Sequence, residues 1–180
     1  MRLPALIHLV AATRALTRCE DVLVLGSAAL LASHADLGEA DGPVTLTRDL
    51  DLLLNPCDEA LAAVVHEALG EGSLFDQRFG VHVDVLRPTI TSTLAAGWAQ
   101  RAVPVPGAEA RALAPADIAA VKLRVGRPKD LELVGILLTL GLVEEQTVAD
   151  LLGRMTWSER EMQAAFRRLG ACRTNVRKGS

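Results

Sequence analysis

The chain has 180 residues, of which 50% are hydrophobic and 23% charged, so it can bury a core and is not an intrinsically disordered protein. Aromatic residues make up only 3% of the chain and tyrosine is absent, which disfavours a nucleic-acid reader built on stacked aromatic side chains. The apolar runs are shorter than the roughly 20 residues of a membrane-spanning helix, so we expect no membrane association.

The N-terminal stretch and the cysteines indicate in which cellular compartment the protein is expected. The N-terminal stretch lacks the small-residue cleavage site of a signal peptide. The three cysteines, Cys19, Cys57 and Cys172, form no C-x-x-C pair, which argues against both a disulfide framework and a zinc site. We therefore expect a cytoplasmic protein.

Acidic residues outnumber basic ones in residues 1–60, and basic residues outnumber acidic ones in residues 121–180. This distribution suits a metal with a polyanionic substrate, but it also arises by chance.

The first predicted element is an amphipathic helix over residues 3–19, where apolar residues recur at helical spacing. A short apolar strand follows at residues 22–25 and ends at Gly26. The sequence AALLASHA then predicts a second helix, with Ser27 as its N-cap. Residues 34–46 have no clear period and predict a loop.

The central part of the chain alternates strands and helices. LTRDLDLLLN, closed by Asn55-Pro56, predicts a second strand. CDEALAAVVHEALGEG predicts a helix with Asp58 and Glu59 in its first turn and Gly70 at its end. FGVHVDVLRP alternates in polarity and predicts a third strand.

Residues 90–114 predict short elements, and from Pro115 onward the pattern becomes helical. A short helix is expected in residues 90–100, and two brief edge strands in RAVPVPG and EARALA, because prolines disrupt a central ladder. The remaining predicted helices are PADIAAVKLRV, RPKDLELVGILLTLG, EQTVADLLGRM and SEREMQAAFRRLG. This order predicts an α/β (α+β) fold: a mixed β-sheet flanked by helices over residues 1–114, and a helical segment over residues 115–180 packed on it.

Two aspartates in the second predicted strand are candidate metal ligands. Side chains alternate along a strand, so Asp49 and Asp51 share one face while the intervening leucines take the other. Two carboxylates at this spacing can converge on a divalent cation such as Mg²⁺. The alternative is a pair of solvated acids at the edge of a strand.

The third predicted strand supplies another carboxylate, Asp84, which alternates with apolar neighbours and leaves the apolar face. Three carboxylates in one cleft suit two-metal phosphoryl or nucleotidyl transfer. His82 shares the face of Asp84, where we expect a partly buried histidine rather than a ligand. Upstream, Gly26-Ser27 opens a predicted helix whose N-terminal N–H groups can receive a phosphate.

These segments together resemble a known family. VLGSAALL, TRDLDLLL and VHVDVL resemble the nucleotidyltransferase-fold superfamily, in which a Gly-Gly or Gly-Ser turn precedes a D-x-D strand and a third acid lies on another strand. DIAAVKLRVGRPKDLELVGIL is similar to the helical segment of bacterial nucleotidyltransferase-like proteins related to AbiEii-type toxins. The resemblance covers roughly residues 21–140, and residues 34–46 look like an insertion beside the active site.

The resemblance implies a nucleotidyltransferase-like mixed sheet, Mg²⁺ (or Mn²⁺) as cofactor and a nucleoside triphosphate as substrate. The residues that it implies are Gly26 and Ser27 for the triphosphate, Asp49, Asp51 and Asp84 for the metals, Asp84 also as catalytic base, and Lys122 for a phosphate. The acceptor it implies is a hydroxyl of RNA (such as tRNA), protein or a small molecule.

Several basic residues have either a structural or a functional interpretation. Lys122 either contacts a phosphate or extends to solvent from an apolar helix. In GRPKD, Gly126 predicts a helix C-cap and Pro128 the start of the next helix. Arg127, Lys129 and Asp130 are then capping and salt-bridge residues, with phosphate contact, through Lys129 above all, as the alternative. The basic C-terminal residues Arg167, Arg168, Arg173, Arg177 and Lys178 are either a solvated end or an RNA contact.

The sequence thus favours a cytoplasmic nucleotidyltransferase. The alternative is a catalytically silent module of the same fold that binds nucleotide or a cognate partner, such as one component of a toxin–antitoxin pair. A small RNA binder is a further alternative, whose affinity would depend steeply on salt. An apolar chain with a helical tail is also compatible with a homodimer.

Overall fold

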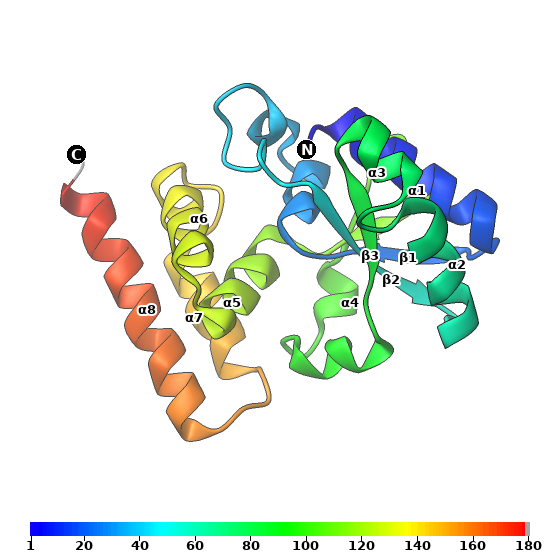
Figure 1. Ribbon diagram of the computed structural model, residues 1–180. Coiled ribbons are helices and arrows are strands. Elements are labelled where there is room, and N and C mark those ends of the chain that lie inside the picture. Colours follow the sequence, from blue (N-terminus) through cyan, green and yellow to red (C-terminus); the bar gives the residue numbers. More distant parts are fainter. Residues whose placement is uncertain (179–180) are drawn as a thin grey trace. The chain divides into compact units, whose positions relative to one another are not determined.

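The computed structural model describes the backbone of residues 1–178 and the side chains as far as Cys172. The chain divides into two compact units, one formed by residues 1–90 and 101–114, the other by residues 91–100 and the chain from Pro115 onward. The first is a mixed α/β unit and the second is helical (Figure 1). Residues 91–100, which the sequence interpretation placed with the sheet, belong to the helical unit.

The first unit contains a five-stranded mixed sheet in the order β3-β2-β1-β5-β4. Its strands are β1 (Asp21–Val24), β2 (Asp49–Asn55), β3 (His82–Val85), β4 (Val103–Pro104) and β5 (Arg111–Ala112). β2 pairs antiparallel with β1 and parallel with β3, while β5 pairs parallel with β1 and antiparallel with β4. The mixed α/β fold expected from the sequence is confirmed. β5 lies inside the sheet rather than at its edge, because β4 covers its outer side.

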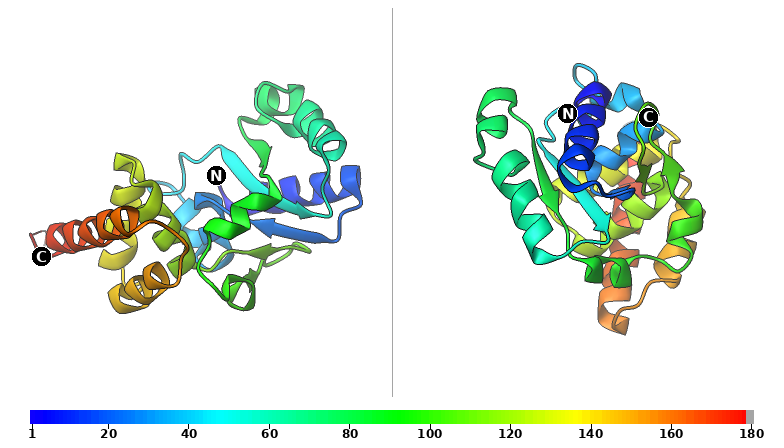
Figure 2. Two further views of the ribbon diagram at one scale, coloured as in Figure 1. Left: turned by 90° about the horizontal axis from the view of Figure 1, so that it is seen from below. Right: turned by 90° about the vertical axis from the view of Figure 1, so that its right-hand side faces the viewer.

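Helices α1 (Leu3–Thr17) and α2 (Glu59–Leu69) pack against each other, and α2 also packs against β3 (Figures 1 and 2). Apolar residues at helical spacing bury the inner side of α1, namely Leu6, Leu9 and Val10. Asp58 is the N-cap of α2 rather than part of its first turn, and its carboxylate accepts the N–H of Leu61 at 2.8 Å. The helix expected over residues 3–19 is confirmed with slightly shorter bounds.

Three segments differ from expectation. The segment after β1 is a 3₁₀ helix, η1 (Ser27–Ala32), so Ser27 is its first residue and Gly26 takes the N-cap position. A second 3₁₀ turn, η2 (Ala35–Gly38), lies within the predicted loop. A helix that the sequence analysis missed, α3 (Leu74–Phe79), precedes β3, so that strand begins at His82 rather than at Phe79.

The second unit consists mainly of α5 (Pro115–Val125), α6 (Pro128–Thr139), α7 (Glu145–Gly153) and α8 (Glu159–Lys178). The first three helices lie close to the predicted bounds, whereas α8 continues beyond the predicted end at Gly170. η3 (Pro88–Thr93) and α4 (Trp98–Arg101) lie in the chain between β3 and β4, near the predicted short helix. Leu123, Val134, Leu137 and Leu152 are among the fully buried side chains of this unit. In the described part of the chain, no helix combines the length and the apolarity that a membrane crossing requires.

The turn between α5 and α6 forms as predicted. Gly126 adopts a left-handed conformation (φ 73°), and its N–H bonds to the Lys122 carbonyl. Pro128 is the first residue of α6. Arg168 of α8 is not a solvated end residue, because its Nη1 donates to the carbonyls of Leu123 and Arg124 at 2.7 and 2.9 Å. The side chains of Arg173, Arg177 and Lys178 lie outside the described residues.

Candidate metal centre

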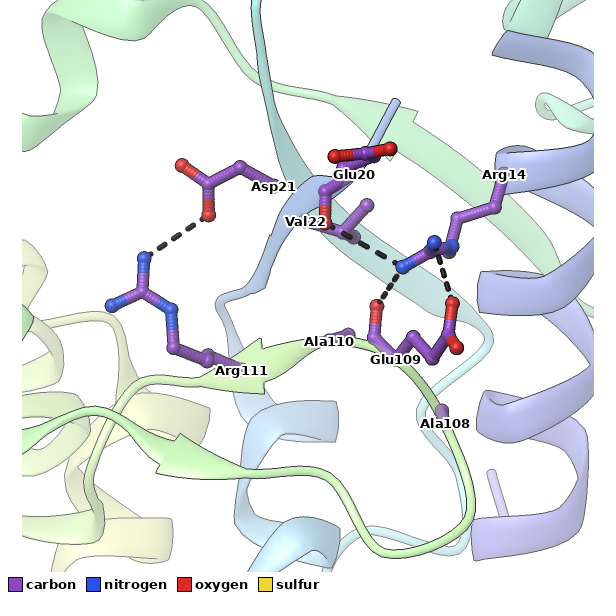
Figure 3. A pocket seen from close by; sticks show the side chains of 8 residues that line it. All are labelled: Arg14, Glu20, Asp21, Val22, Ala108, Glu109, Ala110 and Arg111. Atoms are coloured by element: carbon purple, nitrogen blue, oxygen red, sulfur yellow. Dashed lines mark hydrogen bonds and ion pairs between the residues drawn. The ribbon is translucent and has the colours of Figure 1, made fainter. Parts of the chain in front are cut away.

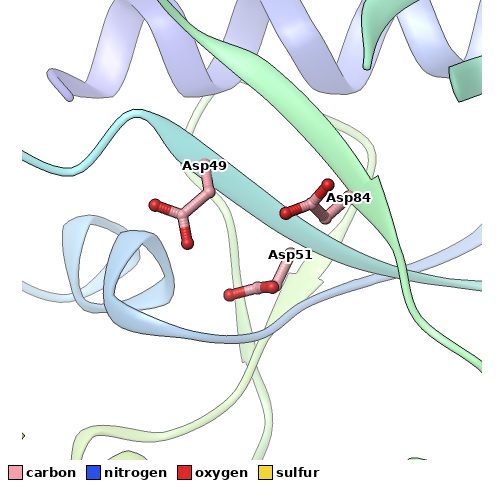
Figure 4. Close-up of side chains that lie close together, drawn as sticks. All are labelled: Asp49, Asp51 and Asp84. Carbon is pink, nitrogen blue, oxygen red and sulfur yellow. The ribbon is translucent and has the colours of Figure 1, made fainter. Parts of the chain in front are cut away.

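Three carboxylates converge on one side of the sheet, where Asp49 and Asp51 project from β2 and Asp84 projects from β3 (Figure 4). One oxygen of each carboxylate lies within 4.8 Å of the corresponding oxygens of the other two. Asp49 is exposed, whereas Asp51 and Asp84 are half-buried. The strand alternation predicted this convergence for the three candidate metal ligands.

The register of β2 and β3 explains the convergence. The two strands are parallel, and Asp51 lies directly opposite Asp84. Opposed residues of neighbouring strands point to the same face, so the two carboxylates are side by side. The leucines that alternate with the aspartates, Leu50, Leu52 and Leu54, are at most 1% exposed. Their burial prevents β2 from rotating or slipping by one residue, and this keeps Asp49 and Asp51 on the outer face.

The glycine of the predicted Gly-Ser turn lies against this cluster. Gly26 has φ 64° and ψ −164°, a backbone conformation that is essentially restricted to glycine. A Cβ atom on Gly26 would overlap with Oδ2 of Asp51. The N–H of the preceding Leu25 donates to the Asp51 carbonyl at 2.9 Å. The turn after β1 and the D-x-D strand therefore form one local structure, in which glycine leaves room for the carboxylate.

Ser27 does not have the role in capping that the sequence suggested. No side chain caps the start of η1, and η1 is a short 3₁₀ helix of 6 residues. A 3₁₀ helix of this length has a small dipole, so its N-terminus is a weaker anion site than that of a long α-helix. The assignment of Gly26 and Ser27 to a triphosphate therefore depends on backbone N–H groups and on a cation that the nearby carboxylates would hold.

His82 belongs to a different cluster from the three aspartates. It is 8% exposed, and its Nδ1 lies 3.3 Å from Oδ1 of Asp76 on α3. Asp76 is also buried and accepts Nη2 of Arg48 at 3.0 Å and the Gly72 N–H at 3.0 Å. This agrees with the interpretation of His82 as a partly buried histidine. The contacts tie the ends of β2 and β3 that carry the metal ligands to α3.

The sequence analysis missed Asp76, although a signal was present. The Ser73 hydroxyl accepts the Asp76 N–H at 3.2 Å, so Ser73 is the N-cap of α3. Serine followed three residues later by an acid is close to a capping box and could have identified this helix. The N–H of Gly72 contributes most to holding the pKa of Asp76 below its usual value, and His82 and Arg48 act in the same direction against the effect of burial.

The loop that precedes Asp49 is held by the ammonium group of Met1. This group donates to the carbonyls of Val44 and Thr45, both at 2.7 Å. Burial lowers the pKa of the ammonium group, and the negative charge of Asp49 acts in the opposite direction. A positive charge therefore lies close enough to Asp49 to interact with its carboxylate.

The two lysines assigned to phosphate belong to the helical unit. Lys122 donates from Nζ to Oδ1 of Asp130 at 2.8 Å, and Arg127 donates to Oδ2 of the same carboxylate, also at 2.8 Å. The Asp130 side chain is only 1% exposed. Lys129 is exposed in the first turn of α6. The salt-bridge interpretation is thus confirmed for Arg127 and Asp130, while phosphate contacts of Lys122 and Lys129 stay predictions.

The composition of the carboxylate cluster fits a hard divalent cation. All three side chains offer oxygen ligands, which Mg²⁺ and Mn²⁺ prefer, and there is no thiol or imidazole in the group. Like charges this close repel each other unless a cation or protons neutralise them. Partial exposure leaves space for water and for substrate oxygens, which Mg²⁺ usually retains among its ligands.

A pocket elsewhere on the first unit does not involve these aspartates (Figure 3). Its lining includes the C-terminal part of α1, the start of β1 and the segment before β5. Its charges are largely paired, since Arg14 binds the Glu109 carboxylate at 2.5 Å and Arg111 binds the Asp21 carboxylate at 3.0 Å. The pocket is therefore lined by internal ion pairs and offers no comparable group of metal ligands.

Comparisons with protein-family models, with curated proteins and with solved structures found no match to this chain.

Proposed function

We propose that the protein is a Mg²⁺-dependent nucleotidyltransferase that moves a nucleoside monophosphate group from a nucleoside triphosphate to a hydroxyl of RNA, protein or a small molecule. The observation that carries this proposal is the convergence of Asp49, Asp51 and Asp84 within 4.8 Å on adjacent strands. The fold expected for such an enzyme, a mixed sheet flanked by helices, is compatible with the observed one.

Asp49 and Asp51 would hold the cation, with Asp84 as a further ligand or as the catalytic base. A bound Mg²⁺ neutralises phosphate charge and activates the reacting oxygens. Asp51 is held by the ladder of β2 and has room for its carboxylate because residue 26 is glycine. In this scheme the backbone N–H groups of Gly26 and Ser27 face the triphosphate.

The transfer is an in-line displacement at phosphorus. The acceptor oxygen forms a bond to the α-phosphorus, and the bond from the α-phosphorus to the oxygen that bridges it to the β-phosphorus breaks. The proton of the acceptor hydroxyl passes to the Asp84 carboxylate when Asp84 acts as base. Pyrophosphate leaves with the electron pair of the broken bond, so atoms and charge balance without a further reactant.

The test is incubation of the purified chain with a panel of nucleoside triphosphates labelled at the α-phosphate, with Mg²⁺ and candidate RNA and protein acceptors. We expect transfer of label with the parent and its loss in Asp49→Asn and Asp51→Asn. Asp150→Asn is the matched control, because Asp150 is an exposed aspartate of α7. Equal activity of the parent and of both site variants would exclude the proposed role of the carboxylates.

Calorimetry separates an enzyme from a silent binding module of the same fold. For the enzyme we expect Mg²⁺-dependent binding of a triphosphate by the parent and none by Asp49→Asn. Absence of binding in both proteins would contradict the proposal and favour a partner-binding module, such as a toxin–antitoxin component. RNA affinity that falls steeply with salt and survives loss of the aspartates would instead indicate an RNA binder.

A further inference from the structure

Two of the three cysteines lie in the segments that adjoin one end of the β1–β2 ladder. The outermost antiparallel pair of this ladder is Asp21 with Asn55. Cys19 lies two residues before Asp21, and Cys57 lies two residues after Asn55. Cys19 therefore lies just before β1 and Cys57 just after β2, and neither residue belongs to a strand. Both cysteines adjoin the same end of the ladder, and a disulfide joins cysteines whose Cα atoms lie about 4.4–6.8 Å apart.

The contacts of the Cys19 thiol place it against the segment that leads to Cys57. Its Sγ lies 3.3 Å from the Asn55 carbonyl oxygen and 4.0 Å from that of Pro56, the residue that precedes Cys57. Cys19 is buried, and Cys57 is half-buried. The thiol of Cys19 is thus directed at the segment that carries Cys57, and solvent has partial access to the latter.

We propose that Cys19 and Cys57 are a redox-active pair, which a disulfide oxidant of the glutathione class converts into an intramolecular disulfide. The electrostatic influence of Cys19 on the Cys57 thiol agrees with their proximity. Cys172 lies on α8 of the helical unit, where its Sγ is 3.4 Å from the Leu131 carbonyl.

The reaction proceeds in two exchanges. The thiolate of half-buried Cys57 attacks one sulfur of oxidised glutathione, which forms a mixed disulfide and releases one glutathione thiolate. The Cys19 thiolate then attacks the Cys57 sulfur and releases the second glutathione. The protein loses two thiol protons and two electrons, and oxidised glutathione becomes two molecules of reduced glutathione.

The first exchange is slow at neutral pH. Burial raises the pKa of the Cys57 thiol, and the adjacent Asp58 and Cys19 raise it further. Since the thiolate is the nucleophile, the rate rises with pH toward this pKa. The disulfide closes a loop from residue 19 to residue 57 that contains Gly26, Asp49 and Asp51. It therefore links the two strands that position the candidate metal centre and restricts the unfolded chain, so the oxidised protein is the more stable form.

The experiment uses the full-length reduced chain in glutathione redox buffers. Free thiols are counted in denaturant after acid quenching, and unreduced peptides are mapped by mass spectrometry. We expect the number of free thiols to fall from three to one, with Cys19 joined to Cys57 and Cys172 free. We also expect half of the folded chain to be oxidised at an oxidised-to-reduced glutathione ratio at least ~10-fold lower than the ratio that half-oxidises the chain in denaturant. The reason is that folding holds the two thiols together.

Variants identify the pair. Cys172→Ser should still lose two thiols, whereas Cys19→Ser should keep a stable glutathione adduct on Cys57, and Cys57→Ser should form no intramolecular disulfide. A stable glutathione adduct on Cys57 in the parent would overturn the proposal. The same holds if three thiols persist at a pH above the pKa of Cys57, or if the link forms equally well in the denatured chain.

Discussion

Asp51 and Asp84 lie directly opposite each other on the parallel strands β2 and β3, so two carboxylates share one face without an intervening residue. Opposed like charges destabilise a sheet in the absence of a neutralising group. With Asp49 nearby, the same arrangement provides a set of oxygen ligands. The strand pairing therefore gathers the oxygen ligands whose charges the proposed cation would neutralise.

Replacement of one of these opposed carboxylates should separate stability from metal binding. Asp84→Asn removes a like charge, so we expect the metal-free protein to gain about 0.2–1 kcal/mol. Mg²⁺ at about 100 times its dissociation constant should stabilise the parent by about 2.7 kcal/mol and the variant by much less. Thermal unfolding with and without Mg²⁺ measures both effects.

Asp150→Asn is the control for this comparison, because its side chain is exposed on α7 in the helical unit. It should keep the full stabilisation by Mg²⁺. If Asp84→Asn gains the same stabilisation from Mg²⁺ as the parent, then Asp84 is not part of a cation site.

Gly26→Ala should damage the candidate metal centre more than a glycine substitution elsewhere does. The conformation of Gly26 costs other residues about 1–3 kcal/mol, and the added Cβ would displace the Asp51 carboxylate. We expect a loss of stability together with at least ~10-fold weaker Mg²⁺ binding, which corresponds to about 1.4 kcal/mol. Calorimetric titration with Mg²⁺ provides the measurement.

Gly141→Ala is the matched control for backbone strain. Gly141 also has a positive φ (67°), but a Cβ at this position would meet no atom within 4 Å. The Gly141→Ala variant should lose stability and keep the Mg²⁺ affinity of the parent. Equal Mg²⁺ affinities for Gly26→Ala and the parent would show that the turn does not shape the site.

Asp130→Asn should destabilise the helical unit in a pH-dependent way. Burial would raise the pKa of Asp130, but Lys122 and Arg127 outweigh this effect and hold the pKa below its usual value. The substitution leaves the largely buried Lys122 without its ion pair, so we expect a loss of about 3 kcal/mol at pH 7.

The sign of the pH dependence follows from the lowered pKa. The carboxylate stabilises the folded state above its unfolded pKa of about 3.9, and this contribution is lost as pH falls through the lower folded pKa. In urea unfolding, the stabilities of the parent and of Asp130→Asn should therefore begin to approach each other below about pH 4 and converge only below the lowered folded pKa. If the difference in unfolding free energy between the two proteins is independent of pH, then the charge of Asp130 does not contribute to stability.

Gly126 and Arg168 should be energetically coupled. A Cβ on Gly126 would overlap with the Arg168 guanidinium, which donates to two carbonyls at the end of α5. Gly126→Ala should displace this guanidinium, so its cost should be smaller when Arg168 is already alanine. A double-mutant cycle measured by urea unfolding should give a coupling of about 0.5–3 kcal/mol. Additive effects would show that the contact contributes nothing.

The periodicity of the sequence predicted the main helices and the strands that carry the aspartates, because burial of alternate or helically spaced apolar residues is a local property. It failed for short elements. α3 has only 6 residues and little apolar periodicity, and η1 is a 3₁₀ helix rather than the expected α-helix. The position of β5 inside the sheet depends on pairing with β4, which local propensity does not describe.

The sequence by itself determined that Asp49 and Asp51 share the outer face of a strand, since Leu50 and Leu52 must be buried. Only the tertiary structure decided that Asp84 lies opposite Asp51, that Gly26 makes room for the Asp51 carboxylate, and that the Cys19 thiol contacts the segment before Cys57. The physical reason is that alternation is a property of each strand alone, whereas register depends on contacts between segments that are distant in the chain.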